Sequence, residues 1–318
     1  MTTAAKTLVY RTALGSYGHT EAIKNGTVAP KGIKLDWVDV GPDIIKGFPR
    51  MCRELAFDIS ELALTTYLTA RAFNKPFTMI PVVVARNFHH AAITCHVKSG
   101  MKKPKDIEGK RVAVRSYTVT AGVWNRGILA SEYGVDLGKV TWVTFEEPHV
   151  QEYVSPSNVV RAPEGKTLVG MLQAGEVDAA IGAGAPSTPD IKYLIENPNE
   201  AAAEGYRRTG IYPVNHTVVI QDKVLQSERW VAEELFNALR ASKDLYIQRL
   251  RTNGAANAED ENRARGMAIL GGADPLPYGV EANRKGLETL IQFAADQKIL
   301  PRRFGLDEVV PAWMHGFK

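Results

Sequence analysis

Cysteine is scarce in this sequence, with only Cys52 and Cys95 among 318 residues. Two cysteines without C-x-x-C spacing exclude a disulfide scaffold and a zinc or redox motif of that kind, so we expect two buried thiols. No run of about eighteen apolar residues occurs that could span a membrane. The N-terminal residues also contain no apolar stretch of the kind found in a secretory signal, so we expect a cytoplasmic protein.

Blocks of like charge are missing as well. The 39 basic and 35 acidic residues are interspersed and give a formal net charge of +4. We therefore expect no nucleic-acid partner and a mild preference for small anions. Hydrophobic residues make up 45% and charged residues 23% of the chain, as in ordinary folded proteins. Its length exceeds the usual size of a single core, so the sequence predicts two lobes.

Strand-like runs alternate with segments of helical spacing along most of the chain. This alternation predicts an α/β protein whose sheets are mostly parallel and flanked by helices. The strand-like runs are 7–12, 33–40, 77–84, 91–97, 111–115, 140–144, 179–182 and 216–220, and the clearest helical segments are 118–133, 168–174 and 229–251.

Two segments are predicted to cross between the lobes: Phe88 to His96, and TGIYPVNHTVVI, where Pro213 interrupts a β-rich run. An inserted lobe then spans 96–209, a discontinuous lobe comprises 1–95 and 210–318, and a ligand cleft is expected between them. The long C-terminal helices could form a homodimer face or pack against their own lobe. The sequence does not decide between these alternatives.

Several segments resemble known proteins. The phrases KPKDIEGKRVAV and LVGMLQAGEVDAAIGAGAP are similar to the type 2 periplasmic-binding-protein fold, a two-lobed clamp with two hinge crossings. A narrower resemblance, to the 4,5-dihydroxyphthalate decarboxylase family, covers nearly the whole chain. It rests on FDISELALTTYL, PVVVARNFHH, VTAGVWNRGILASEYGV, YRRTGIYPVNHTVVI and DPLPYGVEANRKGLETLIQFAADQ.

The resemblance implies a carboxy-lyase of aromatic-compound catabolism. Its substrate would be a hydroxylated aromatic dicarboxylate such as 4,5-dihydroxyphthalate, which loses CO2 after protonation of a ring carbon. This chemistry needs no redox cofactor, and the sequence has no nucleotide-binding fingerprint. The alternative is a non-catalytic solute-binding protein of an ABC-type uptake system that closes on a small anion or an aromatic carboxylate.

The reaction requires groups that take a proton from a phenol and give one to carbon. The candidates are Glu61, His90 and His216. Ser60 is expected to cap a helix that begins at Glu61, which would place the carboxylate at the helix mouth. His90 and His216 lie at the two crossings, so two neighbouring hinge strands would bring both imidazoles to the cleft. An ordinary first-turn acid and packed histidines are the alternative interpretations.

Holding the carboxylates requires cations and free N–H groups. Arg86 precedes the first crossing, and Arg115 ends a strand just before Thr118 and Thr120, which should open a helix and bind an anion there. A glycine-bearing turn with Ser16 and Tyr17 follows the first strand and is a second candidate. Glu146 could bind the ring hydroxyls. The alternatives are that Thr118 is only an N-cap and Arg115 only a surface charge.

His89 stands where the family pattern leads us to expect an arginine. A group that titrates near neutral pH thus replaces a permanent cation, and the substrate could differ for that reason. His89 and His90 also raise the question of a metal. Adjacent residues on a strand point to opposite faces, so both could not ligate one ion, and we expect a site without metal.

Overall fold

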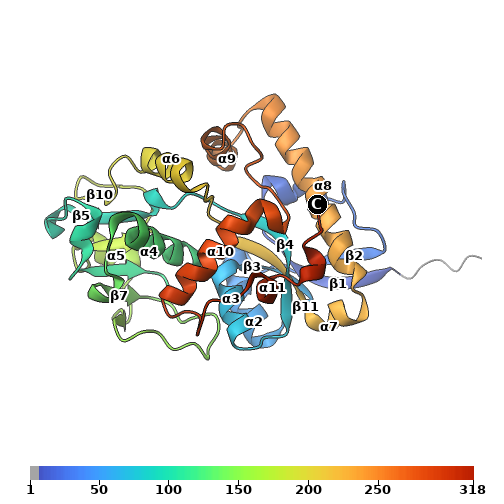
Figure 1. Ribbon diagram of the computed structural model, residues 1–318, viewed down its shortest axis with the longest axis horizontal. Helices are drawn as coiled ribbons and strands as arrows, with labels where there is room; N and C mark the ends of the chain where they lie inside the picture. Colours follow the sequence, from blue (N-terminus) through green and yellow to red (C-terminus); the bar gives the residue numbers. More distant parts are fainter. Residues whose placement is uncertain (1–6) are drawn as a thin grey trace, which may run out of the picture. The chain divides into compact units, whose positions relative to one another are not determined.

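The computed structural model describes residues 7–318, which form two units (Figure 1). The first comprises the chain up to Arg86 together with Val214–Arg284 and Phe304–Lys318, and the second comprises Asn87–Pro213 together with Lys285–Arg303. The sequence-based boundaries lie at 95/96 and 209/210 and leave the whole C-terminal part in the first lobe. That last assignment is wrong, because residues 285–303 pack within the second unit.

The first unit is built on a five-stranded sheet in the order β2-β1-β3-β11-β4. The strand β1 pairs in parallel with β2 and β3, whereas β11 runs antiparallel to both β3 and β4. The direction of β11 makes the sheet mixed. The strands are β1 (Leu8–Ala13), β2 (Ile33–Trp37), β3 (Ile59–Ala63), β4 (Phe77–Ala85) and β11 (His216–Gln221).

An irregularity in β4 accommodates Pro81. The register between β11 and β4 passes from Thr217 opposite Val83 to Val218 opposite Ile80, so the intervening residues of β4 bulge. Proline has no N–H to donate and is tolerated in a sheet at such a bulge. Its carbonyl oxygen instead accepts a hydrogen bond of 2.8 Å from the Gly279 amide.

Helices pack against this sheet and bury its largely apolar strands. The longest, α8, runs over Trp230–Asn253 and places a row of apolar residues against the sheet and α1. Its inner face shares a cluster of Tyr246, Ile247, Leu250 and Leu276. The other helices of this unit are α1 (Glu21–Lys24), α2 (Gly47–Glu54), α3 (Leu64–Ala72), α7 (Asp222–Ser227), α9 (Ala258–Ile269) and α11 (Leu306–Val309).

The second unit contains a six-stranded sheet in the order β10-β5-β9-β6-β7-β8. The strands β9, β6, β7 and β8 are parallel, and β5 runs antiparallel to both β9 and β10. One core cluster includes Ala113, Val143, Met171 and Leu172. The strands are β5 (Ile93–His96), β6 (Arg111–Val114), β7 (Thr141–Thr144), β8 (Val159–Arg161), β9 (Ala179–Ile181) and β10 (Ile191–Tyr193).

Three helices of the second unit are α4 (Thr120–Tyr133), α5 (Leu168–Gln173) and α6 (Pro198–Thr209). A fourth, α10 (Val280–Asp296), begins in the first unit and continues in the second. Its Phe293 ring lies against Gly127 of α4, where an added methyl carbon would be 2.0 Å from the ring. This contact is one reason why residues 285–303 belong to the second unit.

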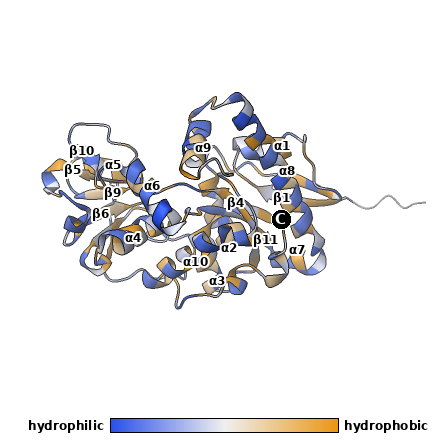
Figure 2. Cartoon of the chain, turned by 45° about the horizontal axis from the view of Figure 1, so that its top comes forward, coloured by the Kyte–Doolittle hydropathy of each residue, from blue (hydrophilic) through white to orange (hydrophobic). Residues whose placement is uncertain are grey.

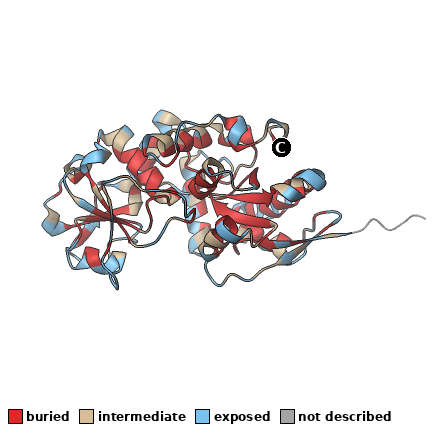
Figure 3. Ribbon diagram, turned by 90° about the horizontal axis from the view of Figure 1, so that it is seen from below, coloured by how far each residue is buried: buried red, intermediate tan, exposed pale blue. Residues whose placement is uncertain are grey.

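In each unit the sheet is buried and the outer surfaces of the helices are exposed. The strands of both sheets are coloured as buried, and the exposed colour gathers on loops and the outer faces of helices (Figure 3). Hydropathy shows the corresponding pattern, with hydrophilic residues on the outer helix faces (Figure 2). Cys52 and Cys95 are both buried and form no disulfide, which confirms the expectation of two buried thiols.

Candidate active site

The Glu61 carboxylate and the His216 imidazole form a close pair in the first unit. In the antiparallel pairing of β3 with β11, Glu61 lies opposite Val218, so His216 is its diagonal neighbour on the same face of the sheet. The distance from His216 Nδ1 to Glu61 Oε1 is 2.6 Å. Glu61 is completely buried, and 18% of the His216 side chain is exposed.

The local structure around Glu61 differs from the prediction. Glu61 lies inside β3, which continues to Ala63, and α3 begins only at Leu64. The Ser60 hydroxyl donates to the carbonyl of Glu61 at 2.8 Å and caps no helix. The expected position at a helix mouth is therefore wrong, because pairing with β1 and β11 keeps this segment extended.

Two further donors hold the Glu61 carboxylate. The Tyr17 hydroxyl donates to Oε1 at 2.7 Å, and the Gly15 amide donates to Oε2 at 2.9 Å. A side chain on Gly15 would lie 2.5 Å from the Tyr17 ring, so the turn needs glycine for this ring position. Burial raises the pKa of Glu61, but the hydrogen bonds from His216, Tyr17 and Gly15 outweigh it and leave the pKa below its ordinary value.

Tyr17 and Ser16 come from the predicted glycine-bearing turn, and they have different contacts. Burial, together with the negative charge of Glu61, raises the pKa of Tyr17, so Tyr17 remains a neutral donor. The Ser16 hydroxyl accepts a hydrogen bond of 2.8 Å from Lys24 Nζ. Burial lowers the pKa of Lys24. In this turn, Tyr17 therefore donates a hydrogen bond to Glu61, whereas Ser16 accepts one from Lys24.

This arrangement suits proton transfer. When His216 Nδ1–H donates to the carboxylate, Nε2 is the ring nitrogen available for exchange, and it has no hydrogen-bond partner within residues 7–318. An imidazole oriented in this way can accept a proton and return it to a bound substrate. The Phe48 ring meets the imidazole edge-on at 5.2 Å and restricts its orientation.

Arg86 lies directly after β4 and is 2% exposed. Its Nη1 donates to Asn283 Oδ1 at 2.9 Å, and its carbonyl oxygen accepts from Arg263 Nη1 at 3.1 Å. Arg86 is thus a buried cation of the same unit as Glu61 and His216.

The remaining predicted residues belong to the second unit. Arg115 Nη1 lies 3.0 Å from Glu146 Oε2, so two predicted substrate ligands pair with each other. Thr118 and Thr120 are buried at the start of α4, and Val119, not Thr118, is the N-cap residue. The simple capping role for Thr118 is therefore wrong, and its role in anion binding stays a prediction.

His89 and His90 do not lie on a strand. His90 begins a short 3-10 helix before β5, and His89 directly precedes it, so the argument from alternating strand faces does not apply to them. The buried His89 ring stacks parallel to Trp124 at a centroid distance of 6.4 Å. His90 Nε2 lies 3.3 Å from Glu132 Oε2, and Arg208 Nη2 lies 3.2 Å from the same oxygen.

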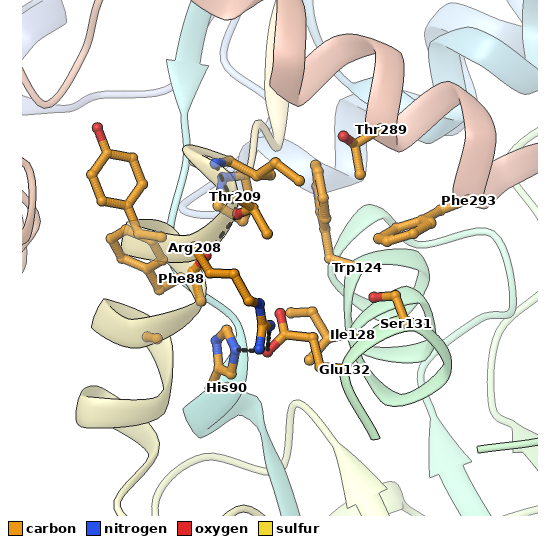
Figure 4. A pocket seen from close by; sticks show the side chains of 15 residues that line it. Phe88, His90, Trp124, Ile128, Ser131, Glu132, Arg208, Thr209, Thr289 and Phe293 are labelled. Atoms are coloured by element: carbon orange, nitrogen blue, oxygen red, sulfur yellow. Dashed lines mark hydrogen bonds and ion pairs between the residues drawn. The ribbon is translucent and has the colours of Figure 1, made fainter. Parts of the chain in front are cut away.

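His90, Glu132 and Arg208 line a cavity of about 260 Å³ in the second unit (Figure 4). The rest of the lining is mostly aromatic and aliphatic, with Phe88, Trp124, Ile128 and Phe293, and it includes three hydroxyl-bearing residues, Ser131, Thr209 and Thr289. Glu132 and Arg208 point toward each other beside His90 in this view. His90 thus faces Glu132 and the cavity, and its catalytic role stays a prediction.

Two curated relatives match this chain, and one of them matches nearly its full length. The 4,5-dihydroxyphthalate decarboxylase of Comamonas testosteroni is 32% identical over 323 residues, which cover 96% of this chain and 97% of that protein. The chain belongs to the 4,5-dihydroxyphthalate decarboxylase family. The protein of the same name from Pseudomonas putida is 35% identical over 208 residues, which cover 61% of this chain and 80% of that protein. The family predicted from the sequence is thereby confirmed.

Solved structures show the fold of this decarboxylase family member. The periplasmic aliphatic sulphonate binding protein SsuA of Escherichia coli superposes with a TM-score of 0.54 at 14% identity, covering 97% of this chain and 92% of that one. The predicted periplasmic-binding-protein-like fold is confirmed. No model of a known protein family matches the chain.

Two other observations concern residues 7–318. No helix there combines the length and apolar character needed to cross a membrane. His, Cys, Asp and Glu side chains in this range form no group of three that could hold a metal ion. The absence of a metal requirement and a ligand position between the two units both stay predictions.

Sequence reasoning missed the contribution of α9 to this region. The Glu259 carboxylate accepts from the Gly18 amide at 3.2 Å and lies 3.6 Å from His19 Nδ1. The contact joins residues 241 positions apart. The only sequence feature that could have drawn attention to α9 is the spacing of Glu259 and Arg263, four residues apart on one helix face.

Proposed function

We propose that the protein removes CO2 from 4,5-dihydroxyphthalate or a closely related hydroxylated aromatic dicarboxylate, without a redox cofactor. The observation that carries the proposal is the buried Glu61 carboxylate 2.6 Å from His216, with the second imidazole nitrogen available for proton exchange. The name and the matched length of the Comamonas relative support the same reaction class.

The proposed reaction has two stages, protonation of a ring carbon and then loss of CO2. A base takes the proton of the phenol para to one carboxylate, and an electron pair moves through the ring to the carbon that bears this carboxylate. That carbon accepts a proton and the ring becomes a dienone. The bond to the carboxylate then breaks, its electron pair restores the aromatic ring and leaves the ring oxygen as a phenolate, and CO2 leaves. The phenolate regains its proton from the base. The product from 4,5-dihydroxyphthalate is 3,4-dihydroxybenzoate, and one proton is consumed.

His216 exchanges the proton in this proposal, and Glu61 orients and balances the charge of the imidazole. Tyr17 and Gly15 keep Glu61 ionised by their hydrogen bonds. A non-catalytic solute receptor is the less supported alternative, because the similarity to SsuA at 14% identity concerns the fold alone. The full-length relative carries the name of an enzyme.

The test is incubation of chelator-treated protein with 4,5-dihydroxyphthalate, followed by CO2 measurement and mass spectrometry of the aromatic product. We expect CO2 and a product lighter by one CO2. His216→Ala should lower kcat by roughly 10²- to 10⁴-fold with the fold retained. His315→Ala, which removes a histidine bonded to the Val310 carbonyl, is the control and should leave kcat unchanged.

Two results would contradict the proposal at different levels. An absence of turnover across a panel of hydroxylated aromatic acids, with and without added metal, would reject the decarboxylase function. Turnover by the wild type together with an unchanged rate in His216→Ala would instead remove His216 from the mechanism.

A further inference from the structure

Arg263 is a buried cation whose charge the folded chain leaves without a close carboxylate. The residue lies on α9 and is 6% exposed. Among residues 7–318, no carboxylate oxygen lies within 4.0 Å of its guanidinium nitrogens. A guanidinium has five N–H donors. Here one bond is made, from Nη1 to the Arg86 carbonyl at 3.1 Å, and Nε is buried without a partner.

The contacts of α9 connect Arg263 with the Glu61–His216 pair. Glu259 lies one turn before Arg263 on the same face of α9 and accepts from the Gly18 amide. The neighbouring His19 ring stacks on Tyr17 with a centroid distance of 5.1 Å and an angle of 3°. Because Tyr17 donates to Glu61, the contacts run without a gap from α9 to the candidate proton-transfer pair.

Two other polar atoms in the contacts around Arg263 also have no hydrogen-bond partner, His19 Nε2 and the Tyr278 hydroxyl, and both are buried. His19 Nδ1 and Glu259 Oε1, by contrast, face each other at 3.6 Å. Burial has the largest effect on the pKa values of Tyr17, His19, Glu259 and Tyr278, and the charge of Arg263 acts further on each of them. Arg263 is therefore near all four side chains.

Such a concentration of unsatisfied groups is unusual in a folded protein. Buried water can satisfy single polar atoms, but water does not balance the charge of a guanidinium. A buried charge is unfavourable unless an opposite charge pairs with it. An anionic ligand beside Arg263 would supply both the charge and the acceptors.

We propose that Arg263 binds a carboxylate of the substrate, and that this is the carboxylate that remains on the ring. The inference rests on the proposed function and names a ligand that sequence reasoning did not find. A cation on the departing carboxylate would stabilise the bound substrate more than the transition state, because the negative charge leaves that group as CO2 forms. A cation on the retained carboxylate stabilises both states equally and contributes to binding.

The kinetic test compares Arg263→Met with the wild type. KM should rise roughly 10- to 100-fold while kcat changes little, because the lost contact is equal in the substrate complex and the transition state. Arg263→Lys should recover part of the affinity, since lysine retains the charge without the planar fork. Arg265→Met, at an exposed position of the same helix, is the control and should leave KM unchanged.

Calorimetric titration with phthalate and benzoate tests the same contact without turnover. Wild-type protein should bind phthalate more tightly than benzoate, and Arg263→Met should lose that difference. A preference that survives in Arg263→Met, or a loss of kcat without a change in KM, would overturn the inference. Should the methionine variant not fold, Arg263→Lys must show weakened phthalate binding with benzoate binding unchanged.

The titration also separates this inference from the proposed function. A wild type that releases no CO2 but loses its phthalate preference on substitution of Arg263 would reject the decarboxylase function and retain the carboxylate site. A wild type that releases CO2, with Arg263→Met equal to it in KM, would reject the Arg263 site alone.

Discussion

The Glu61 carboxylate is fully buried and nevertheless has a pKa below its ordinary value of 4.5. Burial alone would favour the protonated form. Hydrogen bonds from His216, Tyr17 and the Gly15 amide stabilise the charged form more strongly. Since each of these donors acts on the same carboxylate, removing one of them should move the titration of Glu61 in a known direction.

Tyr17→Phe removes one of the donors and should raise the pKa of Glu61. In the proposed mechanism the ionised carboxylate orients His216, so activity falls as Glu61 becomes protonated. The acid limb of kcat/KM against pH should therefore move to higher pH in the variant. A limb that stays in place or moves to lower pH would contradict this role. Tyr10→Phe, at a β1 tyrosine without a hydrogen bond to Glu61, is the control.

The same substitution has a consequence for stability with a defined sign. The folded-state pKa of Glu61 lies below the unfolded value, so its ionisation stabilises the fold above the unfolded pKa. This stabilisation is lost as pH falls through the folded pKa. With the folded pKa raised by Tyr17→Phe, the folded and unfolded pKa values lie closer together. The stabilisation lost on acidification should therefore be smaller and complete at a higher pH, which urea unfolding at a series of pH values can measure.

Among the elements, the strands were the most accessible to sequence reasoning. All eight predicted strand runs overlap strands that begin or end within a few residues of the expected positions. Their apolar composition is sufficient to predict them, because most of these strands are buried in the two sheets. The prediction of a helix start at Glu61 was wrong because no polar capping residue marks the junction of β3 and α3, where the N-cap residue is Ala63.

The packing of α4 against α10 depends on a glycine that the sequence did not single out. The Phe293 ring occupies the space next to Gly127, where a methyl carbon would lie 2.0 Å from Cδ2. Gly127→Ala should therefore lower the free energy of unfolding by roughly 1–3 kcal/mol, through overpacking. In an unhindered helix the same substitution stabilises by about 1 kcal/mol, so the sign of the change tests the contact.

Phe293→Leu provides the matched control for Gly127→Ala. The smaller side chain leaves room for the added methyl group, so the cost of Gly127→Ala should be reduced in the double variant. Denaturant unfolding of the four proteins in this cycle measures the coupling. Independent effects of the two substitutions would show that α4 and α10 do not meet at these residues.

For the whole molecule, local pattern predicted the fold class. The candidates Glu61, His90 and His216 came from their positions at an expected helix start and at the two predicted crossings, for a reaction that the family resemblance implied. Local pattern could not show that Glu61 pairs with His216, because 155 residues separate them and the pairing depends on how β11 enters the sheet. Arg115 and Glu146 likewise pair only after β6 and β7 align. The assignment of residues 285–303 failed for the same reason.

The contacts of Gln297 show how residues 285–303 pack within the second unit. Its side chain accepts from Arg126 Nε at 2.7 Å and donates to the Val123 carbonyl at 2.9 Å. Arg126 is completely buried and already has one nitrogen, Nη1, without a partner. Gln297→Ala would leave a second donor of the buried Arg126 guanidinium unsatisfied.

We expect Gln297→Ala to lower the free energy of unfolding by about 2–4 kcal/mol, because a buried charged donor loses its acceptor. Gln292→Ala, on α10 and five residues before Gln297, is the control. Its side chain bonds only to the exposed Asp296, so its effect should stay within about 0.5 kcal/mol. Guanidinium unfolding followed by tryptophan fluorescence suits the measurement, since Trp124 and Trp142 are buried in the second unit. Equal stabilities of the two variants would mean that residues 285–303 contribute little to the stability of the second unit, contrary to the contacts of Gln297.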